Sequence, residues 1–367
     1  MPIPFPHIEA RGSYRELGRA VGEGAREQIA AAVAFYQEHF RAMAGIDFAE
    51  AERQALTYLP YAQKHLPEYV EELAGMAEGA RQPFVKLLVP NCAEEFTCPT
   101  DDERTAGADR RPRPPGPAHF CTAVAVSAGD RHLVGHNMDW YVVDVDKNVL
   151  FDLTTPSGTR IVTIAGVPYL PILGMNSHGV AYVGNSVYCN DGRPGVPNVF
   201  VRRWVLEASS LGEAAARAAM PARARGSNHL FGDRDGRIWD LETSARGAVL
   251  TEHQGSAAHT NHYVAPAMAV YEGSRHAESR TRLAEAQAAL AAGLAAAEDP
   301  RAVVERVLRS HENAPDCICG HPDDAVPVGE RVMTVASMVC DLDTMELSAC
   351  AGPPCENPYT TWPVSAA

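Results

Sequence analysis

The sequence predicts an α+β protein in which stacked β-sheets are covered on the outside by helices. Three observations support this class. The first hundred residues have the apolar spacing of helices, the residues from position 121 onward alternate with a period of two, and a pair of helical regions interrupts the later strands. This order differs from the strict βαβ alternation that is typical of a doubly wound parallel sheet.

The predicted helices come first. Ser13 and Glu16 have the spacing of a capping box, and apolar residues continue along one helical face toward Phe40. Further helices are expected at residues 49–65, 68–79 and 83–96, punctuated by Pro67, Pro83 and Pro90. From residue 97 to 118 the sequence turns to Asp, Arg, Gly and Pro, which predicts an exposed loop that can be cleaved.

The predicted strands follow this loop. We expect strands at residues 122–126, 149–153, 161–164 and 180–183, a hairpin at 230–241 and a final hairpin from 332–342 and 346–351. Two helical regions separate them, at residues 198–220 and at 279–297 leading to 303–308. The first of these has a second capping-box spacing at Ser210 and Glu213. The chain therefore divides into a helical segment, 1–120, and a segment with the sheets, 121–367.

Composition excludes several classes of protein. A chain of 367 residues with 46% hydrophobic residues can bury a large core, and its net charge of −14 disfavours nucleic acid and anionic lipid as partners. The N-terminus has no basic leader or unbroken apolar segment, and no apolar run approaches the roughly 20 residues of a membrane span. We expect a soluble cytoplasmic protein. Its nine cysteines are an odd number, and most are expected to be reduced thiols.

Cys121 is the strongest candidate for chemistry. It stands where the polar, proline-rich loop ends and a strand begins. A cut before it would give one residue both a thiol and a free α-amine, whose ordinary pKa values are about 8.5 and about 7.7–8.0. Such a residue could supply a nucleophile and its base at neutral pH.

Several short motifs accompany Cys121 in a specific order. They are Gly12-Ser13-Tyr14 with Gly18 and Gly22, Gly75 and Gly79, Asn91 to Glu95, Cys121-Thr122, Gly135 with Asn137 and Asp139, Asn176 to Gly179, Ser227-Asn228-His229, His259 to His262, Cys317 to His321, and Gly352 to Cys355. In this order the chain resembles the self-cleaving acyltransferases and amide hydrolases typified by fungal acyl-CoA:6-aminopenicillanate acyltransferase. These form peptidase family C45 among the N-terminal-nucleophile hydrolases.

The resemblance implies a fold and a mechanism. The fold is a four-layer αββα sandwich of two stacked antiparallel sheets. Cleavage between Phe120 and Cys121 would leave subunits of 120 and 247 residues that stay together as a heterodimer, and higher oligomers are compatible with it. Phe120 replaces the glycine of the founding members. The chemistry permits this change because residue 120 reacts only through its backbone carbonyl group.

The resemblance also assigns the site residues. Cys121 is the nucleophile, Asp139 supports the cysteine and its amine, and Asn261 donates to the oxyanion. Candidates for binding substrate or holding these groups are Thr122, Asn228, His262, Arg280 and Arg282. No cofactor is implied. The substrate would be an N-acyl amide, a small peptide or a β-lactam-like acyl compound, and hydrolysis is preferred to transfer because the chain is acidic and has no phosphate-binding motif.

Four alternatives remain open. Cys121 could act without self-cleavage, with His262 as base, or the enzyme could be an acyl-CoA-dependent N-acyltransferase. A non-catalytic binding protein of the same fold is a third alternative. Asn228 and Asn261 could equally serve buried backbone groups, and His229 and His262 are better interpreted as hydrogen-bonded core histidines. Cys317, Cys319, His321 and Cys355 suggest zinc, but their spacing is not that of structural zinc sites, so no metal is expected.

Overall fold

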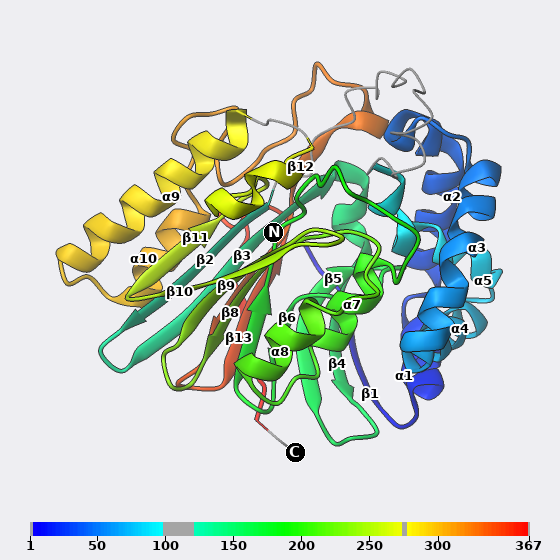
Figure 1. Ribbon diagram of the computed structural model, residues 1–367, viewed down its shortest axis with the longest axis horizontal. Helices are drawn as coiled ribbons and strands as arrows, with labels where there is room; N and C mark the ends of the chain where they lie inside the picture. Colours follow the sequence, from blue (N-terminus) through cyan, green and yellow to red (C-terminus); the bar gives the residue numbers. More distant parts are fainter. Residues whose placement is uncertain (1–2, 98–120, 274–276, 366–367) are drawn as a thin grey trace.

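Two β-sheets lie face to face between two layers of helices (Figure 1). The computed structural model describes residues 3–97, 121–273 and 277–365. The larger sheet has the strand order β1 (His7–Arg11), β4 (Asn148–Thr154), β5 (Arg160–Gly166), β6 (Gly174–Asn176), β7 (Val180–Val183), β8 (Asn228–Asp233), β9 (Ile238–Thr243) and β10 (Ala248–His253). The smaller sheet has the order β11 (Ser256–His259), β2 (Cys121–Ala128), β3 (Arg131–Tyr141), β12 (Val332–Asp341), β13 (Glu346–Ala351) and β14 (Thr360–Pro363).

The helices belong to two groups. The first group covers the larger sheet: α1 (Tyr14–Gly24), α2 (Arg26–Ala44), α3 (Phe48–His65), α4 (Pro67–Ala80), α5 (Phe84–Leu88), α7 (Asn198–Val205) and α8 (Leu211–Ala218). The second group covers the smaller sheet: α9 (Ala277–Ala295) and α10 (Pro300–Leu308). Short 3₁₀ helices occupy Pro90–Cys92, Glu95–Thr97, Val142–Lys147, Pro266–Tyr271 and Val328–Glu330.

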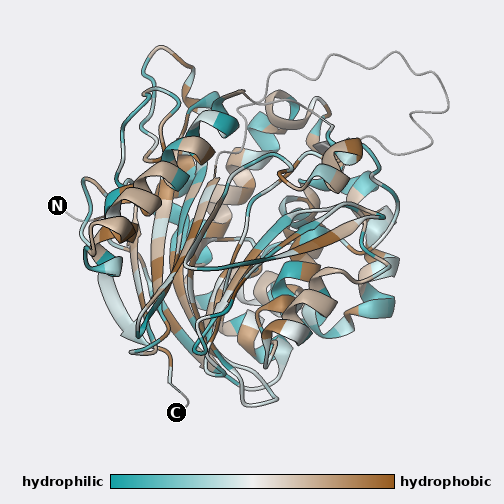
Figure 2. Ribbon diagram, turned by 60° about the vertical axis from the view of Figure 1, so that its left-hand side comes forward, coloured by the Kyte–Doolittle hydropathy of each residue, from teal (hydrophilic) through white to brown (hydrophobic). Residues whose placement is uncertain are grey.

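Alternation along the strands builds the layers. In β2, Ala125 joins the core between the two sheets, whereas its neighbours Val124 and Val126 pack toward α9 and α10. In β4, Leu150 lies between the sheets and Phe151 packs against the N-terminal helices. Both faces of these strands are therefore buried, and Figure 2 shows hydrophobic residues along the central strands.

A seam of glycines joins α1 to α4. A Cβ atom added at Gly18 would lie 1.7 Å from the carbonyl oxygen of Glu72, and one added at Gly75 would lie 2.0 Å from that of Arg15. One turn later, a Cβ added at Gly22 or Gly79 would lie 2.1 or 2.3 Å from a backbone oxygen of the other helix. The two backbones touch because these four residues have no side chain.

Most predicted elements are confirmed. The capping box at Ser13 is present, and the expected strands after residue 121, both hairpins and the helices near residues 49–65, 68–79, 198–220, 279–297 and 303–308 all form. The four-layer arrangement is confirmed as well. No helix in the described part of the chain combines the length and apolar character that a membrane span requires.

Some predictions about the elements are wrong. The segment 1–120 is not purely helical, because residues 7–11 form β1 on the edge of the larger sheet. The sheets are not wholly antiparallel either, since β1 pairs with β4 in parallel. The five residues of β1 alternate between polar and apolar, but only Ile8 is buried and the segment is short.

Two helix predictions also need correction. The helix expected at 83–96 ends at Leu88, and Pro90, which has no N–H to donate, begins a 3₁₀ turn. At Ser210 the capping box is incomplete, because the Glu213 carboxylate accepts from Ser209 N at 2.8 Å instead of from Ser210 N. The predicted loop at 97–118 and the cleavage position at Phe120 lie outside the described residues, apart from Thr97.

Candidate active site

Cys121 is the first residue of β2, and hydrogen bonds fix its backbone on both sides. Its nitrogen donates to Asn261 Oδ1 at 2.8 Å, and its carbonyl oxygen accepts from Arg282 Nη1 at 2.8 Å. The strand is paired with β3 on one side and β11 on the other. The residue is 9% exposed, so a thiol held here is sheltered from bulk water.

Arg282, from α9, connects three groups around Cys121. Besides the Cys121 carbonyl, it donates from Nη1 to Thr122 Oγ1 at 3.2 Å and from Nη2 to Asn261 Oδ1 at 2.9 Å. The side chain is only 1% exposed. A buried guanidinium with this planar fork of donors fixes the positions of its acceptors more firmly than an ammonium could.

Asp139, on β3, supplies the negative charge of the site. Thr334 Oγ1 donates to its Oδ1 at 2.6 Å, and Gly320 N donates in turn to Thr334 Oγ1 at 2.9 Å. Burial raises the pKa of Asp139 to about 7, although the Arg282 charge and the Thr334 hydrogen bond act in the opposite direction. The carboxyl group can therefore change its protonation near neutral pH.

The Cys121 thiol is poorly ionised in this environment. Burial, followed by the charge of Asp139, raises its pKa to about 12. At pH 7 such a thiol would be a thiolate in about one molecule in 10⁵, so nucleophilic attack requires a base within reach.

The thiol faces a largely apolar cavity between the two sheets and the N-terminal helices. Aromatic and aliphatic side chains form much of its wall: Met138, Trp140, Tyr169, Ile172, Leu173 and Val199. Its polar lining includes Glu94, His136, Asp144, Ser186 and Arg202. Such a cavity suits a substrate that presents an apolar group to the enzyme and a few polar atoms to fixed partners.

Glu94 brings the N-terminal segment into this cavity. Its carboxylate lies 4.0 Å from Arg202 Nη1 and 3.6 Å from Arg225 Nη1, and it accepts hydrogen bonds from Ser186 and Asn198. Burial alone would raise the pKa of Glu94, but the two arginines and these hydrogen bonds bring it down to about 2. Residues from both sides of position 121 thus share one buried ion network.

The structure brings together five of the predicted site residues. Cys121, Thr122, Asp139, Asn261 and Arg282 are linked by hydrogen bonds or by charge. His262 lies beside them without lining the cavity. Its Nδ1 is 2.7 Å from Ser279 Oγ, which also accepts from Asn261 N at 2.8 Å.

The remaining predicted residues lie elsewhere. Asn228 is buried in β8, donates to Asp240, and does not line the cavity. Arg280 is exposed on α9, where its charge adds to the effect of burial in lowering the pKa of His262 to about 4. His229 is a buried histidine bonded to Tyr182 and Thr243, as predicted.

Sequence reasoning missed Arg202, Trp140 and Asn185. Trp140 adjoins Asp139, and Arg202 lies in the predicted helix 198–220, but neither position carries a local signal for a cavity wall. Asn185 lies between the cavity residues Gly184 and Ser186, is fully buried, and has no partner for either side-chain amide atom among the described residues. A buried polar group left in this state is suited to meeting a ligand.

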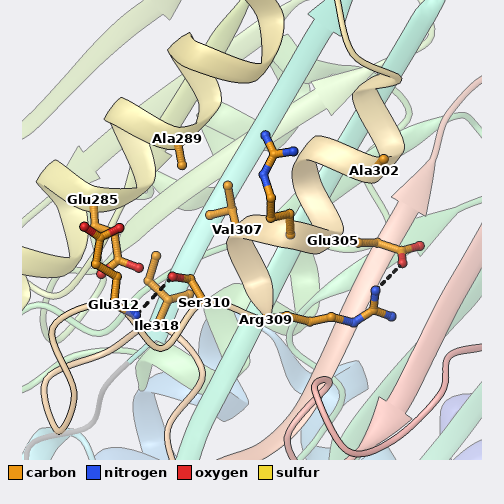
Figure 3. A pocket seen from close by; sticks show the side chains of 10 residues that line it. Glu285, Ala289, Ala302, Glu305, Val307, Arg309, Ser310, Glu312 and Ile318 are labelled. Atoms are coloured by element: carbon orange, nitrogen blue, oxygen red, sulfur yellow. Dashed lines mark hydrogen bonds and ion pairs between the residues drawn. The ribbon is translucent and has the colours of Figure 1, made fainter. Parts of the chain in front are cut away.

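Two further features lie outside the Cys121 cavity. A groove between α9 and α10 is lined by Glu285, Ala289, Arg309, Ser310 and neighbouring side chains (Figure 3). Near its end, side chains of His311, Cys319, His321 and Cys355 converge, with their potential ligand atoms all within 4.8 Å of one another. Cys317, which the sequence grouped with them, is not part of this cluster.

Comparisons with known proteins give a curated relative and several solved structures of similar fold. A curated relative, the 40 kDa form of acyl-coenzyme A:6-aminopenicillanic-acid-acyltransferase of Emericella nidulans, is 24% identical over 259 residues, which is 70% of this chain and 69% of the relative. Among solved structures, a variant of conjugated bile acid hydrolase from Clostridium perfringens has a TM-score of 0.43 at 12% identity, covering 67% of this chain and 98% of that one. Penicillin V acylase from Agrobacterium tumefaciens has a TM-score of 0.44 at 14% identity, covering 63% and 82%.

A match to a protein family covers more than half of the sequence. Residues 126–355 match the family described as acyl-coenzyme A:6-aminopenicillanic acid acyl-transferase, and the matched range begins just after Cys121 and includes Asp139, Asn261 and Arg282. The chain belongs to this acyl-transferase family, and it is an enzyme.

Proposed function

We propose that this enzyme cuts its own backbone before Cys121 and then hydrolyses an N-acyl amide or small peptide-like substrate through a Cys121 thioester. One observation carries the proposal. Asn261 Oδ1 holds the Cys121 nitrogen at 2.8 Å, and Cys121 lines the substrate cavity. The amine and the thiol of Cys121 would therefore both face a bound acyl group. Family membership supports the class of reaction.

Self-cleavage would use the Cys121 thiol, the peptide bond between Phe120 and Cys121, and one water molecule. The sulfur attacks the Phe120 carbonyl carbon, the carbon–nitrogen bond breaks, and the nitrogen takes a proton as the thioester forms. Water then adds to the thioester, releasing the Phe120 carboxylate and the thiol. The product is a Cys121 residue with a free α-amine.

The freed amine would be the base of the mature enzyme. Because the thiol is poorly ionised, it must lose its proton as it attacks, and an α-amine with an ordinary pKa of about 7.7–8.0 can accept that proton at neutral pH. Asn261 Oδ1 is the acceptor that would orient the amine, and Arg282 holds this oxygen at 2.9 Å. After acylation, the amine would activate water for deacylation.

Asn261 has a donor left for the oxyanion. Its Nδ2 donates one hydrogen to Ser186 O at 3.0 Å, and the group carries a second hydrogen. We assign this second N–H to the oxygen of the tetrahedral intermediate. Loss of one such donor typically lowers kcat by about 10²–10³.

The cavity wall supports an apolar acyl group in the substrate. Trp140, Tyr169 and Leu173 offer aromatic and aliphatic contact, whereas Arg202 and Ser186 can orient an amide or carboxylate. N-acylated amino compounds with an aromatic or branched acyl group are therefore the first substrates to test.

Acyl-CoA-dependent transfer is the second candidate, and the name of the family favours it. The net charge of −14 opposes an acyl donor that carries phosphates. Release of free acid without CoA would support hydrolysis, and strict dependence on an acyl-CoA would reverse the preference.

One experiment tests both parts of the proposal. Wild type and Cys121→Ala are analysed by intact mass and then screened against N-acylated amino compounds. We expect wild type as two fragments with turnover, and the variant as one chain without turnover. An active, intact wild-type chain that loses activity on thiol modification would instead favour a cysteine nucleophile without self-cleavage.

A further inference from the structure

Two loops beside the smaller sheet bring four potential metal ligands together, one between α10 and β12 and one between β13 and β14. His311 follows α10, Cys319 and His321 belong to the loop before β12, and Cys355 lies between β13 and β14. We propose that these four side chains bind one zinc ion, separate from the Cys121 site. A set of two thiolates and two imidazoles is typical of tetrahedral zinc.

The distances within the cluster fit one tetrahedral ion. For ordinary zinc bond lengths, the edges of the tetrahedron are about 3.8 Å between two sulfurs, about 3.5 Å between sulfur and nitrogen and about 3.3 Å between two nitrogens. Here Cys319 Sγ and Cys355 Sγ are 3.6 Å apart, His321 Nε2 and Cys355 Sγ are 3.2 Å apart, and the Nε2 atoms of His311 and His321 are 3.0 Å apart. These three of the six ligand–ligand distances need to widen by only about 0.2–0.3 Å to match, and the other three lie within 4.8 Å.

The orientation of His321 also fits a ligand. Its Nε2 points into the cluster, whereas its Nδ1 lies 3.5 Å from Glu356 Oε1. Metal-binding histidines ordinarily donate their second ring nitrogen to a carboxylate or a carbonyl, which fixes the ring and the tautomer.

Hydrogen bonds hold the loops in place before any ion binds. Cys319 N donates to Ser310 O at 2.9 Å, and Glu356 N donates to Pro353 O at 3.1 Å. Gly320, between two of the ligands, exchanges hydrogen bonds with Thr334, through Thr334 N to Gly320 O at 3.0 Å and Gly320 N to Thr334 Oγ1 at 2.9 Å. Little conformational entropy would be lost when the ligands close around an ion.

The cluster explains why the sequence spacing was misleading. Cys317 donates its thiol to Cys319 O at 3.1 Å and lines a different pocket, near Asp139 and Arg282. His311, eight residues before Cys319, takes its place. The expectation of no metal rested on the local Cys317, Cys319 and His321 spacing, which does not describe the four residues that meet.

Four protein ligands leave no open position, so the ion would be structural. It would fix Gly320, whose N–H bonds to Thr334, and Thr334 bonds to Asp139. Ser310 and Glu312, the neighbours of His311, line the groove in Figure 3, so the ion would also fix that end of α10.

The test measures metal binding on the full chain. Protein stripped with a chelator under reducing conditions is dialysed against Zn²⁺ and the bound metal is counted, and Co²⁺ is used as a spectroscopic probe. We expect one Zn²⁺ per chain and, with Co²⁺, the absorption of a tetrahedral site with thiolate ligands. Cys355→Ser and His311→Ala, both at exposed positions, should bind at least 100-fold more weakly. Glu356→Gln should lose about 10–100-fold in affinity.

Matched controls separate this site from other thiols. Cys317→Ser should keep full binding, because its sulfur is outside the cluster. Cys121→Ala should also keep it, so failure of the proposed reaction would leave this result unchanged. Less than one tenth of an equivalent on wild type, unchanged binding in Cys355→Ser and His311→Ala, or a Cys319–Cys355 disulfide as the resting state in mass spectra would each overturn the proposal.

Discussion

Arg282 is the residue on which the geometry around Cys121 depends most. It donates to the Cys121 carbonyl, to Thr122 and to Asn261, and its charge lowers the pKa of Asp139 against the effect of burial. Arg282 contacts no atom that changes bonding in the proposed reaction, so its role is to position the residues that do.

Replacement of Arg282 should therefore reduce turnover more than binding. For Arg282→Ala we expect kcat to fall by about 10²–10³, because both the amine acceptor and the oxyanion donor belong to Asn261, which Arg282 holds. Arg282→Lys should recover only part of the loss, since an ammonium lacks the planar fork of donors. Steady-state kinetics of the cleaved two-fragment enzyme would measure kcat and KM for each variant.

Two arginines nearby provide comparisons for this result. Arg306→Ala removes an exposed arginine of the outer helix layer that pairs with Glu298, and it should leave kcat within about twofold. Arg280→Ala tests the weaker candidate on α9 and should cost less than Arg282→Ala, because Arg280 is exposed. Equal losses for Arg280 and Arg282 would contradict the assigned role of Arg282.

Asp139 should make stability depend on pH. Its pKa is about 7 in the folded protein against 3.8 for an ordinary aspartate, so between these values the folded state binds more protons than the unfolded state. The free energy of unfolding then falls as pH rises from about 4 to about 7. Asp144, whose pKa burial also raises to about 7, acts in the same direction.

Asp139→Asn removes this contribution and leaves that of Asp144. We place Asp139→Asn in the Cys121→Ala background, which we expect to stay a single chain. From pH 4 to pH 8, the free energy of unfolding of this variant should increase relative to that of its parent by on the order of 3–4 kcal/mol. Denaturant unfolding at both pH values measures the difference. A difference that is the same at both pH values would mean that Asp139 does not change protonation in this range.

At the scale of the elements, the contact between α1 and α4 is set by glycines. Gly18 and Gly75 each face a carbonyl oxygen of the other helix at a distance where no Cβ fits. Backbone atoms cannot move aside as a flexible side chain can, so any substitution separates the helices.

Gly18→Ala should therefore destabilise the protein by about 3 kcal/mol or more, although alanine is the better helix former. Gly212→Ala is the matched control. Gly212 lies in α8 with no atom within 4 Å of its would-be Cβ, so the substitution should stabilise by up to about 1 kcal/mol. Thermal or denaturant unfolding compares the two, and a tolerated Gly18→Ala would show that the helices can separate at little cost.

The elements also show how far sequence patterns reach. The strands at 122–126, 149–153 and 161–164 were predictable because both of their faces are buried, which leaves short runs of mostly apolar residues. β1 and β10 were not, because each lies at a sheet edge with most of its residues exposed or partly exposed. β1 pairs with β4, which is distant in sequence, and no local pattern encodes that partner. β10 pairs with its sequence neighbour β9, but none of its residues is buried, so it shows no buried face.

At the scale of the whole molecule, the segments before and after Cys121 share one core. Val21 and Ile29 of the N-terminal helices belong to the same buried cluster as Phe151 and Val199. The buried Arg203 guanidinium pairs with Glu72 at 2.9 Å across the same boundary. Neither segment can bury its apolar face alone.

The two cleavage products should thus remain one particle. We expect fragments of 120 and 247 residues to co-elute near 39.5 kDa, or as a multiple of it, under native conditions and to separate only in denaturant. Light scattering during size-exclusion chromatography measures this. A soluble and active fragment 121–367 without its partner would contradict the shared core.

The candidate site could be predicted only in part, because part of it depends on contacts between elements that are distant in sequence. Cys121, Asp139 and Asn261 come from sequence motifs, Arg282 was a weaker candidate from the resemblance, and the fold brings the four together. Glu94 and Arg202 complete the cavity from elements whose contact only the tertiary structure defines. Of the four converging ligands near α10, Cys319, His321 and Cys355 were considered together in the sequence, and only His311 was missed, because no local spacing connects it with Cys355, 44 residues away in the chain.

The sequence of the N-terminus of the larger fragment tests the central claim most directly. Edman or mass-spectrometric sequencing of purified wild type should give Cys121-Thr122-Ala123 as its first residues, and Cys121→Ala should give one uncut chain without activity. A larger fragment that begins at another residue, or normal turnover by Cys121→Ala, would contradict the account.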